Sequence, residues 1–109
     1  MANDELRPTK ETVDRLCKTL VDQGKLIEAG WKSYDLLVLS PNAPDVQRSE
    51  TRLAFFAGAQ HLFGSIMSIL EPGAEPTEND LRRMTAIDLE LTQYIEEFKF
   101  RTAQPEGSA

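Results

Sequence analysis

The sequence predicts an all-α fold, a three-helix antiparallel bundle with two long helices and a shorter third. Three segments show helical periodicity, at about 9–39, 44–70 and 77–100, and none shows a strand pattern. Two stretches in which proline and glycine cluster, Ser40 to Pro44 and Pro72 to Pro76, separate the three segments. We therefore expect three helices joined by two turns.

The chain of 109 residues suits one compact domain, which we assign to residues 1–101. Residues 102–109 contain proline, glycine and small polar residues but no large apolar side chain. A segment with nothing large to bury does not offset its ordering entropy. We therefore expect a disordered tail.

The first segment, 9–39, has residues suited to packing at alternating spacings of four and three. They are Val13, Cys17, Leu20, Gly24, Ile27, Trp31, Tyr34 and Val38. Such spacing directs one stripe toward a partner helix, and Gly24 would let two backbones approach closely. Trp31 and Tyr34 are expected in the core, with a binding surface as the alternative.

The second segment contains eighteen consecutive uncharged residues, 53–70, preceded by Pro44 and Asp45, which suit the first turn of a helix. As a helix the uncharged stretch would be roughly 27 Å long, close to the thickness of a bilayer core. Gln60 and His61 lie at its middle, where hydrocarbon would leave polar groups without water. We therefore expect a buried central helix and no membrane span.

One side of this second helix is small, which would let another helix pack at short distance. The residues on that side are Ala54, Ala57, Gly58, Gly64, Ser65 and Ser68. The pattern favours self-association through the surface around Gly58, and we predict a homodimer.

The third segment opens with a capping box, in which Thr77 and Asp80 satisfy free amide groups at the helix start. Its apolar face comprises Leu81, Met84, Ile87, Leu91, Tyr94, Ile95 and Phe98. Acidic residues lie largely on the remaining faces, which predicts an amphipathic helix.

Three strings resemble segments of small uncharacterised helical proteins of bacterial and phage or prophage genomes. They are QGKLIEAGW at 23–31, RLAFFAGAQHLF at 52–63 and EPTENDLRRM at 75–84. The resemblance spans most of the chain. It implies a phage-related protein but no activity, cofactor or binding residue.

The polar pair Gln60 and His61 interrupts an apolar helix, and histidine can donate, accept, bind metal or titrate near neutrality. We expect His61 to face solvent or to make one structural hydrogen bond. Catalysis and a polar contact across a dimer are the alternatives. No second histidine exists and Cys17 is distant in sequence, so we expect no metal or other cofactor.

Arg52 is a candidate anchor for an acidic partner, although a solvated or paired surface arginine is the expected structure. The interface candidates are thus Gly24, Trp31, Tyr34, Arg52, Gly58, Gln60 and His61.

The net charge of −6 opposes binding to nucleic acid, which requires clustered cations. One cysteine permits no internal disulfide, and the start has no basic-then-apolar signal, which together favour the cytoplasm. The sequence also lacks phosphate-loop, nucleophile-elbow and paired-histidine motifs.

We therefore predict a non-enzymatic helical interaction or assembly module that forms a homodimer. The alternative is a phage or prophage accessory protein that binds and inhibits a bacterial host protein through the Trp31 region or the acidic third helix. An enzyme with a buried pocket at His61 is the third hypothesis.

Overall fold

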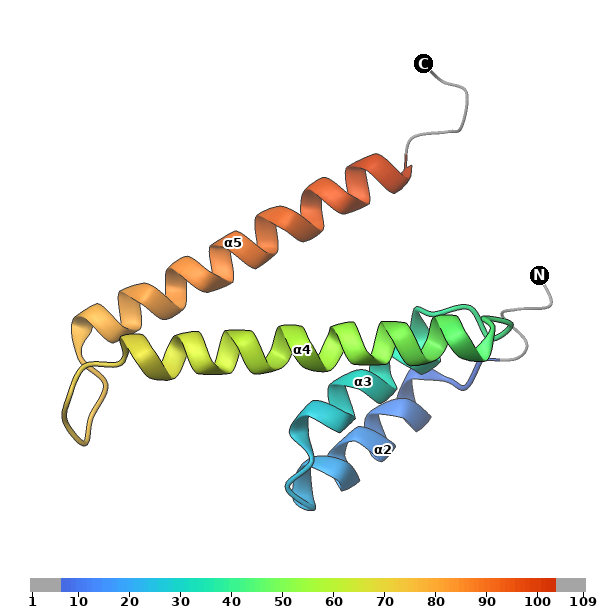
Figure 1. Ribbon diagram of the computed structural model, residues 1–109, viewed down its shortest axis with the longest axis horizontal. Helices are drawn as coiled ribbons and strands as arrows, with labels where there is room; N and C mark the ends of the chain where they lie inside the picture. Colours follow the sequence, from blue (N-terminus) through green and yellow to red (C-terminus); the bar gives the residue numbers. More distant parts are fainter. Residues whose placement is uncertain (1–6, 104–109) are drawn as a thin grey trace. The chain divides into compact units, whose positions relative to one another are not determined.

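The computed structural model describes residues 7–103, with side chains to residue 99, and these residues form four helices and no strand. The helices are α2 (Lys10–Asp22), α3 (Leu26–Leu37), α4 (Asp45–Ile69) and α5 (Glu78–Ala103) (Figure 1). The predicted all-α class is confirmed. The chain divides into two compact units, Met1–Ser65 and Ile66–Ala109.

The prediction of one continuous helix over 9–39 is wrong, because α2 ends at Asp22 and α3 begins at Leu26. Gly24 adopts a φ of 79°, in the left-handed region where residues with a Cβ are strained. The Gly24 amide donates to the Val21 carbonyl (2.9 Å), and the Lys25 amide donates to the Leu20 carbonyl (2.8 Å). These two bonds form a Schellman motif, so Gly24 ends a helix and is not a site of close helix contact.

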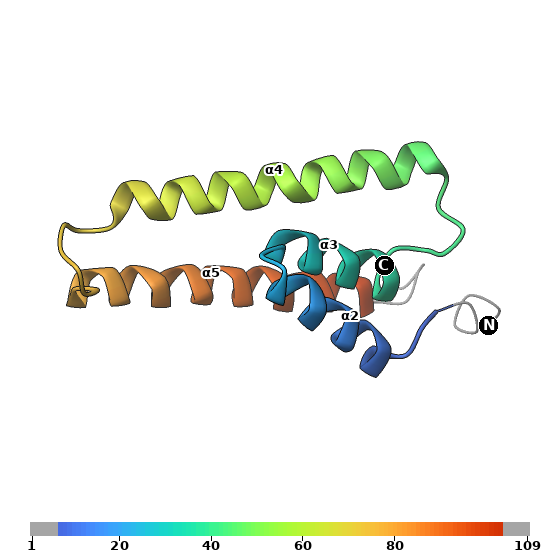
Figure 2. The same cartoon turned by 90° about the horizontal axis from the view of Figure 1, so that it is seen from below.

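This turn joins α2 and α3 into a hairpin, and the two helices lie side by side in both ribbon views (Figures 1 and 2). Thr9 caps α2, as its hydroxyl accepts from the Thr12 amide at 3.2 Å. At the end of α3, Arg7 donates to the carbonyls of Leu36 (3.3 Å) and Leu39 (3.0 Å). A cation suits the negative end of a helix, so Arg7 fastens the start of the hairpin to its end.

The core of this first unit is built around Trp31, whose side chain is 2% exposed. The Trp31 ring lies edge-on to Phe55 of α4 with centroids 5.8 Å apart, and it stacks on Tyr34 at 6.2 Å. Edge-to-face aromatic contacts of this kind contribute about 0.5–1.5 kcal/mol beyond burial. The expectation that Trp31 belongs to the core is met, and its contact with Phe55 attaches α4 to the hairpin.

Within the chain, the close approach between α3 and α4 occurs at Gly30, a position that the sequence pattern did not single out. A Cβ at Gly30 would lie 3.2 Å from Cζ of Phe55, whereas a Cβ at Gly58 would meet nothing within 4 Å. The glycine at position 30 therefore makes room for the aromatic ring.

The expectation of a buried central helix at 44–70 is not met, because α4 has no buried residue. Leu53 is 71% exposed and Phe63 is 65% exposed. Within the first unit α4 contacts the hairpin through Phe55 and its neighbours, so only one side of the helix is partly covered. Among the described residues, no helix combines the length and apolarity needed to cross a membrane.

In the second unit the predicted capping box at Thr77 is confirmed. The buried Asp80 carboxylate accepts from the amides of Thr77 and Glu71, both at 3.0 Å, and the Asp80 amide donates to the Thr77 hydroxyl at 3.1 Å. The Thr77 hydroxyl in turn donates to the Glu71 carboxylate. Asp80 thus joins the residues before the loop to the first turn of α5.

The same hydrogen bonds change the acidity of both carboxyl groups. Bonds from the Thr77 hydroxyl and then from Asn79 lower the pKa of Glu71 below its ordinary value. The amides of Thr77 and Glu71 lower the pKa of Asp80 in the same way. Donors favour the charged form of a carboxyl group, so both groups stabilise the loop when ionised.

Helix α5 extends to Ala103, past the predicted end near residue 100, so residues 102 and 103 are helical and do not belong to a tail. The remaining residues of the predicted disordered tail, 104–109, lie outside the described residues.

Substituting Gly30→Leu should lower the free energy of unfolding by about 1–3 kcal/mol, because the new side chain would overlap Phe55. The matched change Gly58→Leu has open space and replaces a poor helix former, so it should stabilise α4 by less than about 1 kcal/mol. Denaturant unfolding measures both changes. Equal losses at the two glycines would contradict a close contact specific to Gly30.

Acidification should weaken the capping network. The folded-state pKa values of Glu71 and Asp80 are lowered, so their contribution is present above the ordinary values and is lost as pH falls through the folded values. Stability should therefore decline below about pH 4. NMR titration should give carboxyl midpoints below the ordinary ones, and Thr77→Val should raise that of Glu71. Ordinary midpoints in the parent chain would refute this effect.

Candidate functional site: an apolar groove

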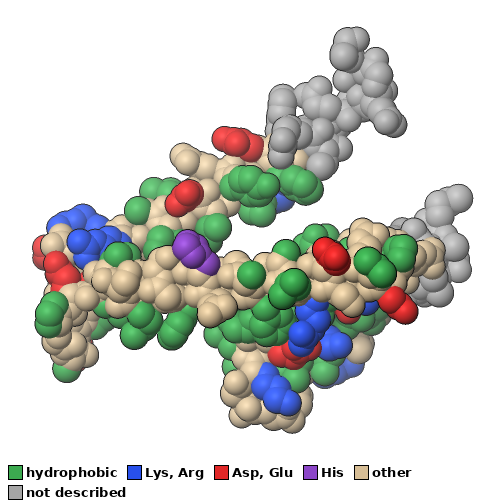
Figure 3. Space-filling view, viewed as in Figure 1, with side chains coloured by type: hydrophobic (Ala, Val, Ile, Leu, Met, Phe, Trp, Pro, Cys, Tyr) green, Lys and Arg blue, Asp and Glu red, His purple; other side chains and the backbone are tan. Residues whose placement is uncertain are grey.

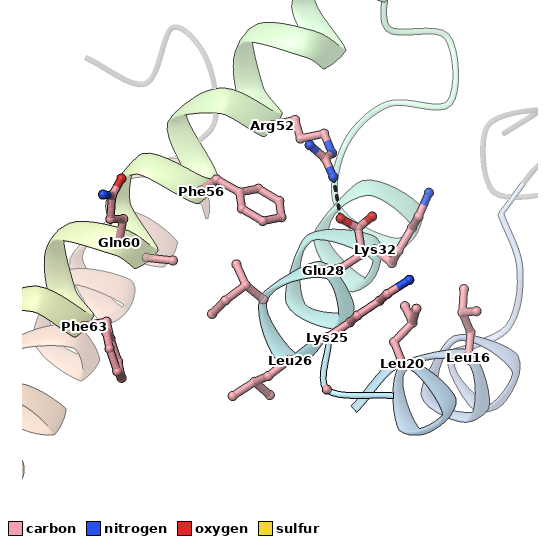
Figure 4. Close-up of a pocket in the computed structure, with 13 residues that line it drawn as sticks. Leu16, Leu20, Lys25, Leu26, Glu28, Lys32, Arg52, Phe56, Gln60 and Phe63 are labelled. Atoms are coloured by element: carbon pink, nitrogen blue, oxygen red, sulfur yellow. Dashed lines mark hydrogen bonds and ion pairs between the residues drawn. The ribbon is translucent and has the colours of Figure 1, made fainter. Parts of the chain in front are cut away.

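An apolar groove with a volume of about 910 Å³ lies between the α2–α3 hairpin and α4 (Figure 4). The hairpin side is formed by Leu16, Leu20, Gly24, Lys25, Leu26, Ile27, Glu28 and Lys32, and the α4 side by Arg52, Phe56, Ala59, Gln60 and Phe63. We refer to the space lined by these residues as the groove. All of these residues belong to the first unit.

The groove is open because α4 meets the hairpin at the Trp31–Phe55 contact and leaves the next turns of both helices uncovered. Figure 4 shows Phe56 directed from α4 toward α3, with Leu26 on the opposite side and Phe63 farther along α4. Leu26 and Phe63 are both exposed, although each carries a large apolar side chain. Covering such side chains would contribute about 25 cal/mol per Å² of apolar surface.

Arg52 closes one end of the groove. Its guanidinium forms an ion pair with Glu28 of α3, drawn as the dashed line in Figure 4. The same guanidinium carbon lies 4.5 Å from the centre of the Phe56 ring, a distance suited to a cation–π contact. The expectation that Arg52 is a paired surface arginine is thus met.

The charged residues of the groove give it a positive balance in an acidic chain. Three lining residues are cations, Lys25, Lys32 and Arg52, and one is an anion, Glu28. Arg52 and Glu28 pair with each other, and Lys25 and Lys32 extend from the α3 side (Figure 4). The groove therefore combines apolar walls with two additional positive charges.

The seven predicted interface residues are distributed over several places in the first unit. Gly24, Arg52 and Gln60 line the groove. Trp31 is buried. The expectation that Tyr34 also belongs to the core is not met, because Tyr34 is 38% exposed, although its ring contacts Trp31 and lies 6.3 Å from the Phe55 ring between centroids. Gly58 and His61 lie on exposed positions of α4 outside the groove lining, and the histidine is visible at the surface in Figure 3.

Several groove residues were missed by the sequence reasoning, which assigned Leu20 and Ile27 to one continuous seam and Phe56 and Phe63 to a buried helix. The relevant signal was the Gly24–Lys25 pair, which is typical of a helix end. A turn there brings Leu16 and Leu20 alongside Leu26, which no straight helix does.

The groove is suited chemically to binding an apolar surface. Its lining contains no histidine, cysteine, serine or threonine, so none of the common nucleophile–base pairs is present in it. Among the described residues, no group of three or more His, Cys, Asp or Glu side chains is arranged to hold a metal ion. Apolar contact and positive charge are what the groove offers.

No family model, curated protein or solved structure matches this chain in the comparisons made with known proteins.

The Arg52–Glu28 pair should contribute little by its charges alone. The two side chains are 48% and 24% exposed, and solvent-exposed pairs are worth about 0.2–1 kcal/mol. Glu28→Gln should therefore lower the free energy of unfolding by less than about 1 kcal/mol and leave the contact between Arg52 and the Phe56 ring in place. Arg52→Gln removes both interactions and should cost about 0.5–1 kcal/mol more. Denaturant unfolding of both variants tests this order, and equal losses would argue against the ring contact.

Proposed function

We propose that this chain is a non-enzymatic, self-associating helical module that acts as a homodimer. The observation that carries this proposal is the exposure of large apolar side chains along α4 and α5. Figure 3 shows such side chains at the surface of both helices. None of the large apolar side chains described on either helix is buried.

The buried apolar set is small for a chain of this length. Among the described residues it consists of Val13, Ala29, Trp31 and Leu39. These four lie in the hairpin or directly after it, whereas α4 has 25 residues and α5 has 26. Most helical stability in proteins comes from packing of an apolar face, so the apolar faces of these long helices have to be covered by a further surface.

A second copy of the chain is a suitable partner because the apolar part of α4 carries no charge. Residues 53–70 include no Asp, Glu, Lys or Arg, so two copies can approach there without like-charge repulsion despite the net charge of −6. Closed two-fold dimers are the commonest symmetric assemblies of soluble proteins, and each copy then covers the other.

A second candidate function is supported by the positive balance of the groove. An acidic amphipathic helix of another protein would find apolar walls and the cations Lys25 and Lys32 there. This arrangement would suit an accessory protein of phage or prophage origin that binds and inhibits a bacterial host protein. It predicts a chain that is monomeric when purified alone.

Light scattering of the purified chain should give twice the mass of one chain, falling toward a monomer on dilution. Because association and burial are coupled, the melting temperature should rise with protein concentration. A monomeric mass together with a melting temperature that does not change over a hundredfold range of concentration would refute self-association and favour the second candidate.

A further inference from the structure

We propose that the groove holds helix α5 of a second copy of this chain. This inference rests on the proposed self-association and identifies the segment that would occupy the site. The occupant of the groove has to be a helix with two features. One is an apolar seam that fits the walls, and the other is a set of negative charges that meet the cations of the groove.

Helix α5 has a seam of the required kind. Its residues are Met84, Ile87, Leu91, Tyr94 and Phe98, at alternating spacings of three and four. This is the spacing of a heptad repeat, in which one stripe faces a partner over the whole length of the helix. Leu91, Tyr94 and Phe98 are exposed, and Met84 and Ile87 are partly exposed.

The negative charges of α5 flank this seam. In the heptad that places Met84 at position a, Asp88 falls at e, and Glu90 and Glu97 fall at g. Positions e and g border the apolar contact and determine which partner is preferred. Between Arg83 and Lys99 the helix carries four acidic residues and no basic one.

The groove presents the opposite charges at its edge. Lys25 and Lys32 come from the α3 side, and neither takes part in the ion pair that joins α4 to α3. A seam placed between the walls would contact Leu26 on one side and Phe63 on the other. Complementary charges at the rim would then set the orientation and favour α5 over a helix with a basic border.

Exchange of α5 between two copies would produce two identical contacts related by a two-fold axis. Each groove would hold the other chain's helix, which covers exposed apolar residues of both units at once. Exchange of one element between identical chains is a recognised route to a dimer.

The first test uses Phe63→Ser in the groove and Leu91→Ser in the seam. Each parent side chain is more than half exposed, at 65% and 54%, so neither change removes a core residue. Each variant alone should dimerise at least tenfold more weakly by sedimentation. The matched controls are Val46→Ser and Leu89→Ser, at exposed positions outside the groove and the seam (71% and 56%). Both controls should keep the parent dissociation constant.

The decisive measurement mixes the two variants. A heterodimer of Phe63→Ser and Leu91→Ser chains contains one contact in which both sides are altered and one that is intact. Mixing should therefore restore association above that of either variant alone, with the two distinguishable chains paired one to one in native mass spectrometry. A groove filled by the α5 of its own chain would give no restoration, and that result would overturn the proposal.

A charge exchange provides a second test that leaves every apolar side chain in place. The double change Lys25→Glu and Lys32→Glu should weaken dimerisation about tenfold, and Glu90→Lys with Glu97→Lys should do the same. A mixture of the two charge variants should associate more tightly than either alone.

The failure of this inference differs from failure of the proposed function. Suppose the parent chain dimerises, and Phe63→Ser, Leu91→Ser and both double charge variants keep its dissociation constant. In that case α5 does not occupy the groove, and self-association uses another surface. If the parent chain is monomeric at every concentration, both proposals are wrong.

Discussion

The contact between Trp31 and Phe55 is the interaction on which the first unit depends. It is the meeting point of the hairpin and α4, and it requires Gly30, since a side chain there would enter the space of the Phe55 ring. The groove exists because this contact lies toward one end of the shared surface. Beyond it the two elements diverge, and their apolar residues line the space between them. The same packing that stabilises the unit thus also creates its candidate binding site.

Much of the secondary structure could be predicted from local chemistry. The helical periodicity and the capping box at Thr77, together with the proline and glycine stretches, located the starts of three helices to within a residue. The break at Gly24 was missed because the seam from Val13 to Val38 keeps its spacing across the turn. A side-chain period cannot show that one glycine adopts a left-handed conformation, although that single dihedral ends the helix.

The candidate site was less predictable, because it depends on how elements pack. Arg52 and Gln60 were identified from their position on one helix, and both line the groove. Gly30 and Gly58 look alike in sequence, yet only Gly30 faces an aromatic ring. His61 drew attention as a polar residue in an apolar run, but it lies on an exposed position outside the groove. Which glycine is close to a neighbour is decided by tertiary contact, which periodicity does not encode.

The Schellman turn at Gly24 has a consequence for the order in which the molecule forms. Its two hydrogen bonds join residues only three and five positions apart, and the Cys17 thiol reaches the Ala29 carbonyl across twelve. Contacts between residues near in sequence close quickly, so the hairpin would form within a single chain as an early, fast event. Covering α4 with a second chain would instead be bimolecular and slow in dilute solution. In the proposed dimer, a newly made chain would therefore have a folded hairpin but exposed long helices. The concentration of the chain would set the rate at which it dimerises.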